Sequence, residues 1–205
     1  MRKELVWTDE QAIDDFLQSQ EIGHLTTIDP DGWPRAVPLN YLWQGGAIYF
    51  HTGLGGKIED LRQNPKVSFT VTEALGLLTS EISASPCRDT QLGQSVLIRG
   101  LAKEIRNPEQ KQRVLNKFIA KYDPAAVVDP ESEQMAPESI MDQPGFHQCL
   151  VVEIEVASLI GRRHLLDGKP EKYRQAVADY FQKKAQDFGS ERDFKTARLL
   201  SRTSE

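Results

Sequence analysis

The stretch YFHTGLGGKIEDLRQNP, residues 49–65, carries the residue types that best suit the binding of a phosphate group. Apolar, strand-like residues lead into three glycines, and Lys57 then opens a helical pattern. Backbone N–H groups and the positive end of a helix dipole converge at such a turn, which favours an anion. His51 and Thr52 end the strand. The turn could therefore hold one phosphate through its N–H groups, the Thr52 hydroxyl and the Lys57 ammonium group, and an ordinary tight turn is the alternative.

The two common nucleotide-binding motifs do not fit this turn. A Walker loop needs Ser or Thr directly after its lysine, whereas Ile58 follows Lys57, and its first glycine would have to replace His51. The dinucleotide fingerprint GxGxxG begins with Gly53 and Gly55 but would need its third glycine in place of Ile58. A single phosphate group therefore remains the best-fitting ligand of the turn.

The preceding segment, WPRAVPLNYLW, predicts a strand with one open edge. Pro34 and Pro38 have the same parity, so their missing N–H groups lie on the same edge, and that edge is not expected to be fully paired. A planar heterocycle with alternating donors and acceptors, such as an isoalloxazine ring, could use this edge, with Val37 and Leu39 as apolar contacts. A twisted edge strand at the rim of a barrel, without any ligand, is the alternative.

The surrounding elements predict a mainly β fold with peripheral helices. Turn residues separate about six segments of strand character, namely residues 22–29, 34–43, 47–52, 66–74, 94–105 and 147–161. The first three of these segments are expected to form a three-stranded meander. Helical patterns cover residues 8–20, 55–63, 107–122 and 169–188. The sequence does not alternate strands with helices as βαβ units do, so we expect a six-stranded antiparallel small barrel at residues 1–156 and a C-terminal helical extension at 157–205. The polar tail from residue 189 is expected to be frayed or to depend on a partner for its order.

Composition narrows the function classes. The net charge is −5, and the segment 122–145 holds carboxylates but no lysine or arginine. A basic stripe is missing, which argues against nucleic-acid binding. No apolar run approaches the ~20 residues of a membrane span, and the N-terminus does not resemble a secretory signal, so we expect a cytoplasmic protein without a membrane partner. Cys87 and Cys149 stand far apart without metal-ligand spacing, so no metal site is expected.

The segment from Gly23 to Val71 resembles the N-terminal half of the pyridoxamine-phosphate-oxidase-like FMN-binding split barrels, and among them the nitroimidazole-resistance (Nim-like) branch. The shared order is RxVP, YFHx, GxKxxxL and then NP, and the resemblance extends over roughly residues 8–156. It implies that FMN lies in a cleft between two subunits, hence a homodimer. It also implies cofactor contacts by residues that match the family's motifs: Arg35, Val37, Pro38 and Leu39 along the flavin ring, His51 and Thr52 beside the phosphate, and Lys57 on the phosphate.

Two departures from the family pattern bear on the reaction. Ser95, in QSVLIRG, is also expected to contact the cofactor, although it stands where the oxidases carry the glutamine of RQVRVEG. The C-terminal ARLLSRTSE lacks their WRL-type substrate segment. Oxidation of vitamin B6 is therefore not expected. The resemblance instead implies an FMN-dependent oxidoreductase that passes electrons from a reduced nicotinamide to a small organic substrate, such as a nitro-aromatic. His51 is the catalytic candidate, since the ordinary histidine pKa of about 6.5 suits proton transfer.

Three alternatives remain open at the level of sequence. The first is a flavin-binding or sensing protein without turnover. The second is a split barrel that holds a deazaflavin or a haem. The third is a dimeric scaffold that binds none of these ligands.

Overall fold

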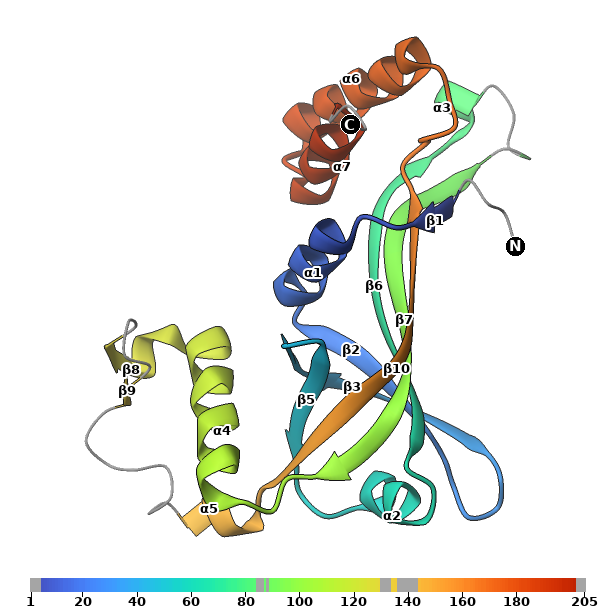
Figure 1. Ribbon diagram of the computed structural model, residues 1–205. Coiled ribbons are helices and arrows are strands. Elements are labelled where there is room, and N and C mark those ends of the chain that lie inside the picture. Colours follow the sequence, from blue (N-terminus) through green and yellow to red (C-terminus); the bar gives the residue numbers. More distant parts are fainter. Residues whose placement is uncertain (1–4, 84–86, 88, 130–133, 136–143, 202–205) are drawn as a thin grey trace. The chain divides into compact units, whose positions relative to one another are not determined.

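A computed structural model describes residues 5–83, 87, 89–129, 134–135 and 144–201 (Figure 1). Its strands are β1 (Val6–Trp7), β2 (Ile22–Ile28), β3 (Pro34–Asn40), β4 (Leu42–Gln44), β5 (Ala47–Thr52), β6 (Lys66–Leu78), β7 (Thr90–Glu104), β8 (Val127–Asp129), β9 (Gln134–Met135) and β10 (Leu150–His164). Its helices are α1 (Glu10–Ser19), α2 (Gly56–Gln63), α3 (Ser80–Ser83), α4 (Pro108–Tyr122), α5 (Pro144–Gln148), α6 (Glu171–Phe188) and α7 (Glu191–Ser201). None of these described helices is both long and apolar enough to span a membrane.

The chain divides into two compact units. The barrel unit comprises Glu10–Val71 and Leu97–Leu159, and the extension unit comprises the described residues of Met1–Asp9, Thr72–Val96 and Ile160–Glu205. Strands β6, β7 and β10 contribute residues to both units, so each strand is longer than the barrel requires.

The main sheet is mainly antiparallel and has the strand order β3-β2-β6-β7-β10-β5-β4, with β1 paired to β10. Its two outermost strands are joined through Tyr41, because the chain leaves β3 at one edge and enters β4 at the other. The Tyr41 ring is fully buried and its hydroxyl donates to the Leu17 carbonyl at 2.6 Å, which ties the crossing to α1. Fully buried Phe50 and Phe69 help to fill the interior. This arrangement confirms the predicted barrel with peripheral helices.

The predicted strand number is wrong, because the main sheet of the described residues has eight strands rather than six. The segment 34–43 splits at Tyr41, so β4 pairs with β5 while β3 pairs with β2, and the predicted meander is interrupted. The additional strand β1 has only two residues, Val6 and Trp7, paired with Arg162 and Gly161. A strand of that length shows no periodicity in the sequence.

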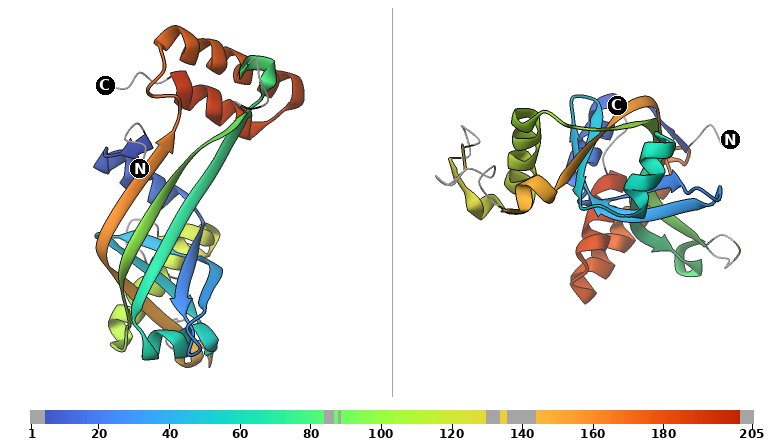
Figure 2. Two further views of the ribbon diagram at one scale, coloured as in Figure 1. Left: turned by 90° about the vertical axis from the view of Figure 1, so that its right-hand side faces the viewer. Right: turned by 90° about the horizontal axis from the view of Figure 1, so that it is seen from below.

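Helices α2 and α4 are among the helices that flank the barrel strands within the barrel unit. Helix α2 lies at one end of the barrel strands in Figure 1 and in the left view of Figure 2, and it buries Ile58 and Leu61. Helix α4 begins as predicted, since the Asn107 side chain accepts a hydrogen bond from the Gln110 N–H at 2.8 Å. Its apolar face, which includes Phe118, packs in a cluster with Val151 of β10. Half of the acidic segment 122–145, namely residues 130–133 and 136–143, lies outside the described residues.

The extension unit is closed by a helical hairpin of α6 and α7, which lie side by side in Figures 1 and 2. The prediction of a frayed tail after residue 188 is therefore wrong. Gly189 adopts the left-handed conformation (φ 67°) that ends α6, and the chain turns into α7. Thr196 of α7 is buried and its hydroxyl accepts the Gly76 N–H of β6 at 2.9 Å. Tertiary packing on β6 therefore orders this polar segment.

Candidate functional site

The glycine-rich turn between β5 and α2 presents free hydrogen-bond donors to open space. The N–H groups of Ile58 and Glu59 donate to the Gly55 carbonyl at 2.8 and 3.3 Å. The N–H groups of Gly56 and Lys57 precede them, and the first N–H groups of a helix have no acceptor within it. Apart from each glycine itself and its two neighbours in the chain, no atom of the described residues lies within 4 Å of where a side chain on Gly53 or Gly55 would start. The turn can therefore receive an anion at the positive end of the helix dipole.

Arg35 of β3 lies beside the start of α2. A Cβ atom on Gly56 would lie 2.6 Å from the Arg35 Nη1 atom, so the absence of a side chain there lets the guanidinium group approach the helix. The Arg35 Nε atom is 2.9 Å from the Oδ2 atom of Asp60, whose side chain is buried. That same oxygen accepts the Thr27 hydroxyl at 2.7 Å. Asp60 thus fixes the position of the guanidinium group next to the turn.

Lys57 supplies the second cation of the turn. Its side chain is half-buried in the first turn of α2, and no carboxylate among the described residues forms an ion pair with it. Asp60 offsets the charge of Arg35, whereas the charge of Lys57 is left for a ligand or solvent. We call Arg35, Gly55, Gly56 and Lys57 the anion cradle.

Strand β3 has the open edge that its prolines predict. Among the described residues it is hydrogen-bonded to β2 alone and stands at the end of the sheet. Val37 and Leu39 oppose Leu25 and Gly23 of β2 and are half-buried. Pro38 opposes the exposed His24 and therefore lies on the other face of the strand. Apolar side chains and an unpaired backbone edge thus adjoin Arg35 along one strand.

His51 and Thr52 are neighbours on β5, and their side chains point to opposite faces of the sheet. The His51 ring meets the Phe118 ring edge-on, with centroids 4.8 Å apart, and its Nδ1 atom lies 3.8 Å from the Cys149 Sγ atom. This packing partly buries the imidazole and lowers the pKa of His51. The Thr52 hydroxyl donates to the Gly53 carbonyl at 3.1 Å. The two side chains therefore do not converge on one point.

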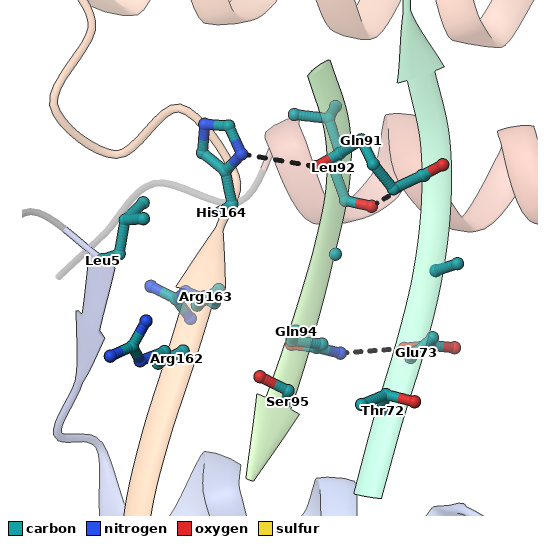
Figure 3. A pocket seen from close by; sticks show the side chains of 12 residues that line it. Leu5, Thr72, Glu73, Gln91, Leu92, Gln94, Ser95, Arg162, Arg163 and His164 are labelled. Atoms are coloured by element: carbon teal, nitrogen blue, oxygen red, sulfur yellow. Dashed lines mark hydrogen bonds between the residues drawn. The ribbon is translucent and has the colours of Figure 1, made fainter. Parts of the chain in front are cut away.

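Ser95 is the one predicted site residue that belongs to the extension unit, because every other one lies in the barrel unit. It lines a groove with residues of β6, β7 and β10 (Figure 3). In the part of the chain that the structure describes, His, Cys, Asp and Glu side chains form no group of three or more that could hold a metal ion.

Sequence reasoning missed Asp60, Phe118 and Cys149. The acidic residue in KIEDLRQ carried no signal of its own, since its burial depends on Arg35 and Thr27 from other strands. Phe118 and Cys149 meet His51 only because α4 and the start of β10 pack beside β5. A carboxylate on the buried side of a helix, such as Asp60 on α2, indicates an ion pair in the interior. This sign could be used only once it was known which side of the helix is buried.

Comparisons with known proteins agree with the fold. Residues 9–163 match the family described as pyridoxamine 5'-phosphate oxidase. A search of curated proteins found no match. One similar solved structure is a Bacteroides thetaiotaomicron protein named for 5-nitroimidazole antibiotic resistance, with 24% identity, coverage of 77% of this chain and 86% of that chain, and a TM-score of 0.62.

Two further similar structures are named for their cofactors. The flavocytochrome of Azotobacter vinelandii is 19% identical, over 78% of this chain and 69% of its own, with a TM-score of 0.63. A FAD- and haem-binding protein of Mycobacterium smegmatis is 16% identical, over 77% of this chain and 72% of its own, with a TM-score of 0.62. At these identities the likeness shows a shared fold. Together with the match over most of the sequence, it confirms the predicted resemblance: the chain belongs to the pyridoxamine 5'-phosphate oxidase family of split-barrel proteins.

Proposed function

We propose that the protein binds FMN and acts as an FMN-dependent oxidoreductase, which passes electrons from a reduced nicotinamide to a small organic acceptor of the nitro-aromatic type. The observation that carries this proposal is the anion cradle, in which Lys57 and the clamped Arg35 flank two N–H groups; among the described residues neither Lys57 nor these N–H groups have a partner. FMN ends in one phosphate, and the cradle offers donors for one such group. The structural neighbours named for flavin binding and for nitroimidazole resistance support the same choice.

The residues present fit the flavin in two respects. The cradle supplies cations and N–H donors at a helix start, which suits a phosphate dianion. Val37 and Leu39 supply half-buried apolar contacts on the strand that also carries Arg35, so one strand can contact both a ring and a phosphate. The turn does not match the dinucleotide fingerprint of Rossmann folds, because Ile58 stands where its third glycine would be.

The flavin supplies the hydride and electron chemistry when bound, so the chain's own task is positioning. Arg35 and Lys57 hold the phosphate end. Val37 and Leu39 keep water from the ring. Because burial lowers the pKa of His51, its imidazole is mainly neutral near pH 7, which favours a hydrogen-bonding or proton-accepting role over that of a cation beside the phosphate.

A homodimer with the flavin between its subunits is part of the proposal, and the barrel unit offers a surface for it. A groove of about 420 Å³ on β2, β6, β7 and β10 is flanked by Ile28 and Leu101, which are 38% and 47% exposed. Trp33, just before β3, is 72% exposed. Exposed apolar side chains beside such a groove favour an interaction surface. Light scattering on the flavin-loaded protein tests the dimer, and a monomer that retains full FMN affinity would refute it.

The absorbance of the freshly purified protein between 300 and 550 nm tests the cofactor. The proposal requires a flavin spectrum, either at once or after addition of FMN, and mass identification of FMN after denaturation. A colourless protein that takes up no FMN would overturn it, and an intense Soret band would indicate haem instead. Anaerobic mixing with NADH or NADPH, followed by a nitro-aromatic acceptor, then tests turnover. Bound flavin that neither donor reduces would identify a flavin-binding protein without nicotinamide-dependent activity.

A further inference from the structure

The extension unit contains a groove of about 310 Å³ that is separate from the anion cradle of the barrel unit. Strands β6, β7 and β10 line it, and Leu5 lies at its β1 side (Figure 3). Pockets that bind small organic molecules measure about 300–1,000 Å³, so this groove suits a ligand of about one ring.

One positive charge in this groove has no counter-charge in the part of the chain that the structure describes. Arg162 is exposed, and among the described residues no carboxylate forms an ion pair with it. The neighbouring Arg163 differs, since its Nη2 atom lies 3.3 Å from the Asp167 carboxylate and its guanidinium group lies 5.6 Å from the centre of the Trp7 ring. Arg162 is thus the cation that the groove offers to a ligand.

The carboxylate of the groove is neutralised from outside it. Glu73 forms an ion pair with Lys195 of α7 and accepts a hydrogen bond from the Gln94 amide at 2.9 Å (Figure 3). Its negative charge is therefore offset, and it does not repel an anion that pairs with Arg162. The C-terminal hairpin thus contributes to the charge of the groove through Lys195, although residues 171–201 lie outside the matched family segment 9–163.

The rest of the lining combines small residues with hydroxyl groups. Ala74 and Gly93 leave little more than backbone on their strands, and a Cβ atom on Gly93 would lie 2.5 Å from the Glu73 carbonyl oxygen, so the position is restricted to glycine. Thr72 and Ser95 add hydroxyl groups that can donate to an anion. Because these side chains are small, a flat molecule can lie directly against the strands.

We infer that this groove binds a small aromatic carboxylate, with the carboxylate on Arg162 and the ring over Ala74 and Gly93. An arginine guanidinium group matches a carboxylate with two parallel hydrogen bonds, which favours it over a neutral amide of the same shape. The binding rests on the groove alone and requires no flavin.

Isothermal titration calorimetry on the purified full chain tests this inference with 4-nitrobenzoate and its neutral analogue 4-nitrobenzamide. The carboxylate should bind about 10- to 100-fold more tightly than the amide. Arg162→Gln should remove most of that difference and leave amide binding unchanged. Arg198→Gln, which removes an exposed arginine of α7 outside this groove, is the matched control and should change neither affinity. Equal binding of both compounds, no binding of either, or an unchanged preference in Arg162→Gln would overturn the inference.

Two further measurements keep the outcome unambiguous. Lys195→Met should weaken carboxylate binding about 3- to 10-fold, because it releases the negative charge of Glu73 in the groove wall. Saturating FMN should leave the carboxylate affinity unchanged, and competition between the two would place the carboxylate in the flavin site and overturn a separate site. Absence of FMN binding would refute the proposed oxidoreductase and leave this result intact.

Discussion

Replacing Lys57 with alanine should weaken FMN binding while leaving riboflavin binding unchanged. Lys57 is half-buried in the first turn of α2 without an ion pair among the described residues, so its ammonium group is available to a phosphate. Two unit charges about 4 Å apart attract by about 4 kcal/mol at an effective dielectric constant of about 20, before desolvation is subtracted. Hydrogen bonds to charged groups retain about 1.5–3 kcal/mol. At about 1.4 kcal/mol for each factor of ten, the dissociation constant of FMN should rise about 10- to 140-fold.

Titration of apoprotein with each flavin, followed by flavin fluorescence, measures both constants. Riboflavin has the same ring but no phosphate, so it reports on every contact except those at the cradle. Lys172→Ala is the matched control, because it removes an exposed lysine of α6 and should change neither constant. Lys57→Ala should also keep the unfolding temperature of the unchanged protein, since Lys57 lies outside the apolar face of α2 that Ile58 and Leu61 form.

Two results would refute the reasoning. If FMN and riboflavin lost affinity equally, Lys57 would act on the ring or on the fold rather than on the phosphate. If FMN affinity did not change at all, Arg35 and the backbone would hold the phosphate without Lys57, and the lysine would have no part in the site.

Three further predictions concern stability. Asp60→Ala should lower the free energy of unfolding in urea by about 1–3 kcal/mol, because it leaves the buried Thr27 hydroxyl without its acceptor; no change would show that the clamp is unimportant. Gly76→Ala should cost about 1–3 kcal/mol by overpacking, since its Cβ atom would overlap the Phe181 ring, and an unchanged unfolding temperature would contradict that packing. Burial lowers the pKa of His51 in the folded protein, whereas in the unfolded chain the pKa is about 6.5. As the pH falls through this value, the unfolded chain binds the proton more readily than the folded protein does. Stability should therefore fall as the pH drops through about 6.5, and His51→Gln should flatten that part of the urea-unfolding profile, whereas an identical profile would reject the burial of the ring.

Local signals predicted the helices that carry their own start and stop residues. Asn107 and Pro108 marked the start of α4, and the Asn107 side chain caps it as expected. Helix α7 was missed because its segment is polar and follows a glycine, which reads as a tail. Its order comes from contacts with β6 that are distant in sequence, such as the hydrogen bond between Gly76 and Thr196. Tertiary packing of this kind leaves no period in a short segment.

In the candidate site, too, the features that are adjacent in the sequence were predicted, and the contacts between distant segments were not. Lys57 and the glycines were found because the strand, the turn and the helix start are adjacent in the sequence. The position of Arg35 beside Gly56 was not found, because it depends on how β3 and α2 meet across the barrel unit. Asp60, which determines that position, is a buried carboxylate whose partners lie on β2 and β3. Sequence motifs therefore located the cradle but not the clamp that orients it.

The prolines of β3 explain how an open sheet edge can bind a ligand and yet not pair with a strand of another molecule. Proline has no N–H group and fits where that group would point away from the neighbouring strand, so positions 34, 36 and 38 face the edge away from β2. Of these, Ala36 alone can donate a hydrogen bond, while all three can accept one. A second strand needs donors and acceptors in alternation and finds too few donors here, which protects the edge from aggregation. A ligand that donates from one or two ring positions needs no such ladder, so this edge remains available to it.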